Sequence, residues 1–196
     1  MMHRRSFLVG LGTTLTFAPH AAFALNQNEA RSLINTLVGD INAVIEAGKG
    51  EKAMFREFER IFASYSDTSY ISAYAMGVEA RRASSSQKRE FSKAFQGYIA
   101  RKYGRRFREF IGGRLEVAKV KKVKKWYEVE TVAYLKGQSP FEVTFQVSNR
   151  SGKNRFFNMY IEGVNLLLTE RTEVGAIIDR NKGDLDKTIR DLKTLG

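Results

Sequence analysis

The stretch LEVAKVKKVKKWYEVETVAYLKGQSPFEVTFQVSNRSGKNRFFNMYI, residues 115–161, decides the fold, because apolar and polar residues alternate along four successive segments of it. A period of two is typical of strands that bury one face. The apolar positions are Leu115, Val117, Tyr127, Val129, Ala133, Leu135, Phe141, Val143, Phe145, Val147, Phe157, Met159 and Ile161. The alternate positions carry Glu116, Glu128, Glu130, Glu142, Gln146 and Asn158. We predict four consecutive antiparallel strands with one buried and one largely solvated face, joined by turns at 137–140 and 149–152.

Segments with helical periodicity flank this stretch on both sides. Apolar residues recur every three or four positions over 26–46, 54–62 and 67–77, which predicts three helices. Residues 84–87, SSSQ, are typical of a capping box and predict the start of a long helix that ends at Gly112. Residues 164–178, and a last segment opened by Asp184, predict two more helices. Helices, then a sheet, then helices indicate an α+β fold, with a single domain over residues 25–196.

Residues 1–24 have the pattern of a cleaved export signal. Arg4 and Arg5 precede a short uncharged, mostly apolar run, and a small-x-small site follows at 22–24, AFA. The paired arginines before Phe7 and Leu8 resemble a twin-arginine signal. The general secretory route and an ordinary buried N-terminal helix are the alternatives. We expect an exported protein located in the periplasm.

The composition removes several kinds of chemistry. There is no Cys, and the two histidines, His3 and His20, both lie in the predicted signal. Thiolate catalysis, a Ser-His-Asp triad and Cys- or His-ligated metals are therefore excluded from residues 25–196. We expect no catalytic residues, no metal and no cofactor. With 43% hydrophobic residues the chain is able to form a real core.

Basic residues are concentrated in two segments, and the formal net charge is +12. One runs along the long helix, over residues 88–108, and the other occupies residues 119–125. Clustered cations interleaved with aromatic residues are typical of nucleic-acid binding. Export argues against that partner and favours anionic lipid or an acidic membrane complex. A solvated helix face without any partner is the other interpretation.

The order of these features resembles the MlaC, or toluene-tolerance, family of periplasmic phospholipid-binding proteins. The sharpest similarity is at residues 161–173, IEGVNLLLTERTE, followed by an aliphatic pair and a Gly-Asp-Leu opening of the last helix. Residues 82–87 and the series Phe91, Phe95, Tyr98, Tyr103, Arg106 and Phe107 support it. Asn165, where the family usually has Ser, and Val174, where it usually has an aromatic residue, depart from the pattern.

The resemblance implies a twisted sheet with helices packed over it, a somewhat NTF2-like cone, and an apolar cavity that holds acyl chains. It implies a carrier that exchanges phospholipid with an inner-membrane ABC transporter complex and an outer-membrane lipoprotein-porin complex. We expect the carrier to be a monomer. The residues expected to line the cavity or close its mouth are Tyr70, Tyr74, Phe91, Phe95, Tyr98, Val129, Val143, Phe145, Phe157, Met159, Ile161, Leu167, Leu168 and Val174. Those expected to bind head groups or dock partners are Arg101, Lys102, Arg105, Arg106 and Arg171.

Two other functions compete with the carrier. An enzyme on an NTF2-like cone would need an acid inside the cavity, and the alternation places Glu128, Glu130 and Glu142 on the outer face. A basic protein that docks to acidic surfaces without lipid cargo would need only its charged helix. A filled core in place of a cavity would rule out the carrier.

Overall fold

Six α-helices and one antiparallel sheet make up the part of the chain that the computed structural model describes, residues 25–104 and 112–196. The helices are α1 (Gln27–Glu46), α2 (Glu51–Tyr65), α3 (Thr68–Met76), α4 (Ser85–Gly104), α5 (Leu166–Arg180) and α6 (Leu185–Leu192), with a 3₁₀ helix at Gly77–Arg81. The strands are β1 (Arg114–Val123), β2 (Trp126–Tyr134), β3 (Phe141–Ser148), β4 (Arg155–Ile161) and β5 (Val164–Asn165). The α+β prediction is confirmed. The predicted signal, and the end of the predicted long helix, lie outside the described residues.

Helix starts follow the local capping signals in the sequence. Asn26 accepts from the backbone N–H of Glu29 at the start of α1, and Asp67 and Asp184 cap α3 and α6 in the same way. At the start of α4 the backbone N–H of Gln87 donates to Ser84 Oγ, and the Gln87 side chain accepts from the Ser84 backbone N–H. The predicted capping box at residues 84–87 is confirmed, because a helix start needs only these nearby donors and acceptors.

The sheet is a meander in the order β1-β2-β3-β4-β5, with every neighbouring pair antiparallel. The prediction of four strands omitted β5, which has two residues and pairs with the end of β4. Val164 and Asn165 were expected to begin the next helix. They extend the sheet instead, and α5 starts at Leu166 with Asn165 as its cap.

Two bulges interrupt the regular alternation of the strands. In β1 the register shifts at Ala118, so that Val120 lies opposite Val129 and is buried. In β4 Phe156 pairs with Val147, and Asn158 pairs with Gln146, the residue before Val147 on β3. Phe157, between them, has no partner on β3 and is the extra residue of the bulge. A strict period of two, as predicted, therefore fails at these two points, because each bulge inserts one unpaired residue and reverses the alternation beyond it.

The outer face of the sheet is more buried than the alternation of apolar and polar residues predicted. Gln146 is buried there, and so is its neighbour Asn158 on β4, whose side chain reaches from Gln146 to the start of α5 at the border of the sheet. Gln146 Nε2 donates to Glu128 Oε1 at 3.0 Å, and Asn158 Nδ2 donates to Gln146 Oε1 at 3.1 Å. Because these three polar side chains on neighbouring strands satisfy one another, they tolerate removal from water.

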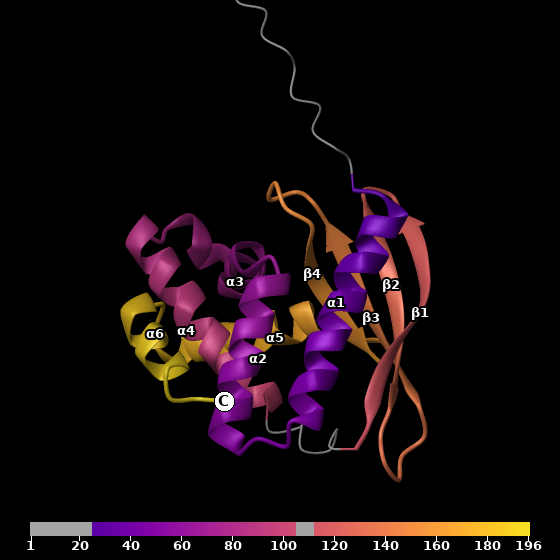
Figure 1. The fold of residues 1–196 in the computed structure, drawn as a ribbon. Helices are drawn as coiled ribbons and strands as arrows, with labels where there is room; N and C mark the ends of the chain where they lie inside the picture. The colour runs from indigo at the N-terminus through magenta and orange to yellow at the C-terminus, as the bar shows by residue number, and fades with distance from the viewer. Residues whose placement is uncertain (1–24, 105–111) are drawn as a thin grey trace, which may run out of the picture.

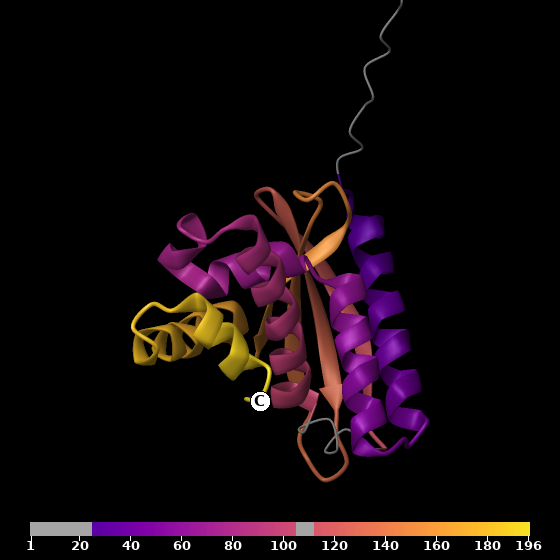
Figure 2. The same cartoon turned by 90° about the vertical axis from the view of Figure 1, so that its left-hand side faces the viewer.

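The helices cover the other face of the sheet in layers. α1 lies across β1 and β2, and α2 lies beside α4 (Figure 1). α6 packs on α4 on the side away from the sheet, and α3 packs against α5 (Figure 2). Fully buried side chains from both layers form the core: Ile34, Leu37, Phe91, Phe95, Val129, Val147, Val174 and Leu192. α4 thus has neighbours on two sides, which decides where its aromatic residues point.

Candidate functional site

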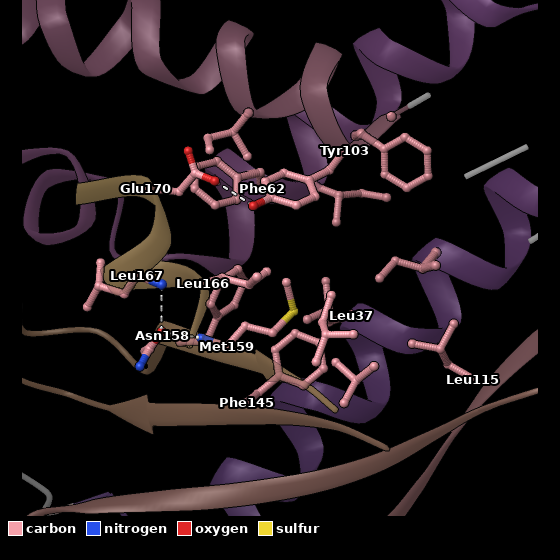
Figure 3. Close-up of a pocket in the computed structure, with 18 of the residues that line it drawn as sticks. Leu37, Phe62, Tyr103, Leu115, Phe145, Asn158, Met159, Leu166, Leu167 and Glu170 are labelled. Carbon is pink, nitrogen blue, oxygen red and sulfur yellow. Dashed lines mark hydrogen bonds between the residues drawn. The ribbon is translucent and has the colours of Figure 1, made fainter. Parts of the chain in front are cut away.

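A cavity of about 510 Å³ lies between the sheet and the helices (Figure 3). Sites for small molecules typically have volumes of roughly 300 to 1,000 Å³ and mostly apolar walls. The walls come from α1, α2 and α4 on one side, and from β3, β4 and the first turn of α5 on the other. The interior is therefore hollow where a solid core was the alternative.

Seven of the residues expected to bind lipid line this cavity. They are Phe95, Val143, Phe145, Phe157, Met159, Ile161 and Leu167. Val143, Phe145, Met159 and Ile161 share the inner face of β3 and β4 by register, since Val143 pairs with Ile161 and Phe145 with Met159. The structure therefore brings together the predicted residues of β3 and β4, the aromatic ring of Phe95 on α4, and Leu167 at the start of α5.

The other seven do not line the cavity. They are Tyr70, Tyr74, Phe91, Tyr98, Val129, Leu168 and Val174. Val129 is fully buried between Val120 and Phe145, so it packs solidly within the sheet layer. Leu168 is 52% exposed on α5.

The aromatic residues of α3 and α4 in this group have other partners. Tyr98 donates to Glu173 Oε2 on α5 at 2.9 Å, and Phe91 stacks on Phe95. Because α4 packs against both α2 and α6, its apolar side chains are divided between the cavity and the helix–helix core. Tyr70 contacts Phe157, and Tyr74 lies under the guanidinium group of Arg171.

Several lining residues were not predicted. They are Leu37, Ile41, Phe58, Ile61, Phe62, Ile71, Ile99, Ala100, Tyr103, Gly104, Leu115, Leu135, Gln138, Ser139, Phe141, Phe156, Asn158, Glu162, Leu166 and Glu170. The cavity-lining residues of α1 and α2 follow the helical periodicity of the buried faces of these helices. The sequence therefore contains a signal for them. Phe156 carried no such signal, because it reaches the inner face only through the bulge in β4.

Asn158 joins the sheet to the first turn of α5 at the cavity wall (Figure 3). The backbone N–H of Leu167 donates to Asn158 Oδ1 at 3.1 Å, and Asn165 Oδ1 accepts from the N–H of Leu168. Two of the free N–H groups at this helix start are therefore satisfied by asparagine side chains.

Replacing Asn158 with Ala should lower the free energy of unfolding by about 1 to 3 kcal/mol, because the buried Leu167 N–H and Gln146 Oε1 lose their partner. Urea unfolding followed by circular dichroism measures the change. The matched control is Asn28→Ala on the exposed start of α1, which should change stability by less than about 0.5 kcal/mol. Equal effects of the two substitutions would contradict this role for Asn158.

A buried ionic cluster joins α4 to α5 beside the cavity. Lys102 Nζ lies 2.7 Å from Glu170 Oε1 and 2.5 Å from Glu173 Oε2, and Tyr103 donates to Glu170 Oε1. Glu170 has 4% side-chain exposure, and its Oε2 is buried without a hydrogen-bond partner among the described residues. Burial raises the pKa of Glu170, against the opposing hydrogen bonds from Lys102 and Tyr103.

The same cluster shifts the pKa values of its other members. Burial raises the pKa of Tyr98 and of Tyr103, and the neighbouring carboxylates raise both further. For Glu173, partial burial raises the pKa, but hydrogen bonds from Lys102 and Tyr98 outweigh it and hold that pKa below its usual value. Lys102 is therefore the cation that forms ion pairs with both carboxylates of the cluster, Glu170 and Glu173.

The predicted docking residues that the structure describes are committed to internal contacts. Arg101 donates to the backbone carbonyl oxygens of Leu192 and Leu195, which fixes the segment after α6 against α4. Arg171 donates to the carbonyl oxygen of Tyr74 at 2.9 Å. Lys102 belongs to the ionic cluster. Arg105 and Arg106 lie outside the described residues.

The fold and the cavity together define an α+β protein in which a curved antiparallel sheet and a helical layer enclose an apolar ligand-sized space. The chain belongs to the MlaC protein family, whose model matches residues 32–194. A search of curated proteins finds no match.

Among solved structures the fold is similar to a phospholipid-binding protein from Ralstonia solanacearum, whose structure is in complex with a phospholipid. The TM-score is 0.69 at 17% sequence identity, and the match covers 83% of this chain and 98% of that one. Within the described part of the chain no helix is both long and apolar enough to span a bilayer.

Proposed function

We propose that this protein binds phospholipid, with the acyl chains in the apolar cavity, and carries it through the periplasm. The observation that carries the proposal is the 510 Å³ cavity walled by aliphatic and aromatic side chains. Membership of the MlaC family, and the phospholipid in the Ralstonia solanacearum protein of the same fold, support it.

The energetics of transfer fit a carrier that needs no reactive group. Two acyl chains of about 16 carbons would cost roughly 24 kcal/mol in water, at about 0.8 kcal/mol per methylene. A cavity about as apolar as the bilayer makes the exchange nearly neutral, so this protein needs neither ATP nor a nucleophile. Exchange with an inner-membrane ABC complex and an outer-membrane lipoprotein-porin complex is the proposed route. Residues 1–24 are the proposed export signal.

The contacts of the acidic residues bear on the choice between a carrier and an enzyme. Glu170 is the kind of buried acid that an enzyme of this shape would need. Its Oε1 already accepts from Lys102 and Tyr103, which commits that oxygen to the contact between α4 and α5, whereas its Oε2 is buried without a hydrogen-bond partner among the described residues. Glu128 and Glu142 bond to Gln146 and Thr144 on the opposite face of the sheet.

Mass spectrometry of organic extracts from the purified protein tests the proposal. We expect phospholipid at close to one molecule per protein, retained through gel filtration, because acyl chains leave the cavity into water only at high cost. The control is the same extract from an unrelated exported protein prepared in parallel. A folded preparation without phospholipid that also takes none up from vesicles would contradict the proposed function.

A further inference from the structure

Exposed lysines gather at one end of the sheet, in and beside the turns that join β1 to β2 and β3 to β4. Tyr127 pairs with Val147, so the two turns lie next to each other, at the upper end of the sheet in Figure 1. Lys121 is also exposed there, but it lies opposite Glu128 on β2. The remaining exposed lysines of the two turns form a surface that we call the basic tip: Lys122, Lys124, Lys125 and Lys153.

The charge of the basic tip is not neutralised within the described parts of the chain. Residues 117–127 and 143–161 contain no Asp or Glu. Glu128 accepts from Gln146 at 3.0 Å, and Glu29, at the end of α1 that lies on the same side of the molecule, accepts from the backbone N–H of Asn26 (Figure 1). Over residues 25–104 and 112–196 the lysines of the basic tip form no ion pair. They differ in this from Arg101, Lys102 and Arg171, which are committed to internal contacts.

The basic tip is separate from the cavity. None of its lysines lines the cavity. The exposed lining residues Gln138, Ser139 and Glu162 mark where the cavity reaches the surface, and they follow the opposite ends of the same strands. β2 has nine residues, so the two ends of the sheet lie roughly 26 Å apart at a rise of about 3.3 Å per residue. A partner on the basic tip therefore leaves the mouth of the cavity uncovered.

The kind of cation indicates the kind of partner. Lysine is a strongly hydrated point charge on a flexible stem, without the planar fork by which arginine binds a carboxylate in a fixed geometry. Arg150, the arginine of the β3–β4 turn, is stacked on the rings of Tyr70 and Phe157. Protein–protein interfaces are depleted in lysine and centre on apolar and aromatic side chains. The large exposed apolar side chains of the described residues all lie outside the two turns. Clustered lysines of this kind suit the diffuse negative charge of an anionic bilayer.

We propose that the basic tip docks this protein on the surface of a bilayer that contains anionic phospholipid. The inference goes beyond the proposed function and does not depend on it, because attraction to phosphates at a surface is separate from the shelter of acyl chains in the cavity. Each lysine near such a surface contributes about fivefold in affinity, so the basic tip contributes several hundredfold. Salt screens this attraction, so binding falls steeply as the salt concentration rises.

A variant that combines Lys122→Gln, Lys124→Gln, Lys125→Gln and Lys153→Gln tests the docking. Co-sedimentation with vesicles of equal parts phosphatidylglycerol and phosphatidylcholine, in about 0.1 M NaCl, gives the partition coefficient. We expect wild-type protein to bind these vesicles and not vesicles of phosphatidylcholine alone. The variant should bind the charged vesicles about a hundredfold more weakly. Its lysines are exposed, so the variant should keep the circular dichroism spectrum of wild type.

The matched control removes the same amount of charge from exposed lysines on or beside α2, α4, α5 and α6: Lys52→Gln, Lys93→Gln, Lys182→Gln and Lys187→Gln. Lys182 has a positive φ like Lys124, so the two sets also match in backbone conformation. The Debye length at this salt concentration is about 10 Å, and charges further than that from the bilayer are largely screened. The control should therefore stay within about threefold of wild type.

Each outcome bears on the basic tip or on the bilayer as its partner. Equal losses in the two variants would refute the basic tip, because net charge alone would then account for binding. Equal binding of wild-type protein to charged and uncharged vesicles would refute it as well. If wild-type protein binds neither kind of vesicle, the bilayer is refuted as partner, and capture on poly-glutamate beads that only the tip variant loses would assign the surface to an acidic protein. The phospholipid content of organic extracts tests the carrier separately, and a failure there leaves the basic tip standing.

Discussion

Val143→Phe should lower the amount of bound phospholipid at least tenfold while leaving the free energy of unfolding within about 0.5 kcal/mol of wild type. Val143 lies on the inner face of β3 and lines the cavity. A larger side chain there enters space that lipid would fill, so it displaces cargo without overpacking the core. Quantitative mass spectrometry of extracts measures occupancy, and urea unfolding of lipid-free protein measures stability.

Val129→Phe is the matched control, because Val129 has the same side chain on the neighbouring strand, is fully buried and does not line the cavity. An extra ring in a filled core forces neighbours to move, which typically costs about 1 to 3 kcal/mol. The pair therefore distinguishes a hollow from a solid interior. Equal destabilisation by both substitutions would show that the space beside Val143 is already filled.

Lys102→Met should destabilise the protein by about 3 kcal/mol near neutral pH. The substitution keeps an apolar chain of similar length but leaves the buried Glu170, with 4% side-chain exposure, without its cation. Without Lys102, Glu170 has a folded-state pKa still further above its unfolded value, so folding takes up a proton. Stability therefore rises as pH falls through that folded pKa, and the deficit of Lys102→Met should shrink on acidification.

The double variant with Lys102→Met and Glu170→Gln is the control for this prediction. Removing both charges leaves no buried ion without a partner, so most of the lost stability should return even at neutral pH. Urea unfolding of both variants at several pH values provides the comparison. A Lys102→Met protein as stable as wild type at neutral pH would contradict the ionic cluster and return Lys102 to the surface role that its sequence context suggested.

Helices and strands can be located from the sequence where the signal is local. Asn26, Asp67, Ser84 and Asp184 begin helices through hydrogen bonds within three residues, and those bonds form in the same way in any globular context. The alternation in β2 and β3 is regular because neither strand contains the inserted residue of a bulge. α+β topology followed from these signals without knowledge of any long-range contact.

The site could be predicted only in part, because hydrophobic periodicity does not distinguish a side chain facing a void from one facing another ring. Val129 and Val143 have the same pattern in sequence, and only the second lines the cavity. The charge pattern has the same limit. Lys102 belongs to a basic run, but its acidic partners Glu170 and Glu173 lie about 70 positions away in sequence, where no local rule connects them.

The two bulges have a consequence for how the hollow arises. Each lets its strand bend and twist more than a regular ladder allows, so the sheet curves around the helices. Removing Ala118 would leave the inward and outward residues of β1 in proper alternation, and would delete only the bend. Curvature of the backbone at the bulges therefore helps to keep the sheet and the helices apart. Phenylalanines of β3, β4, α2 and α4 form walls around the space that this curvature leaves.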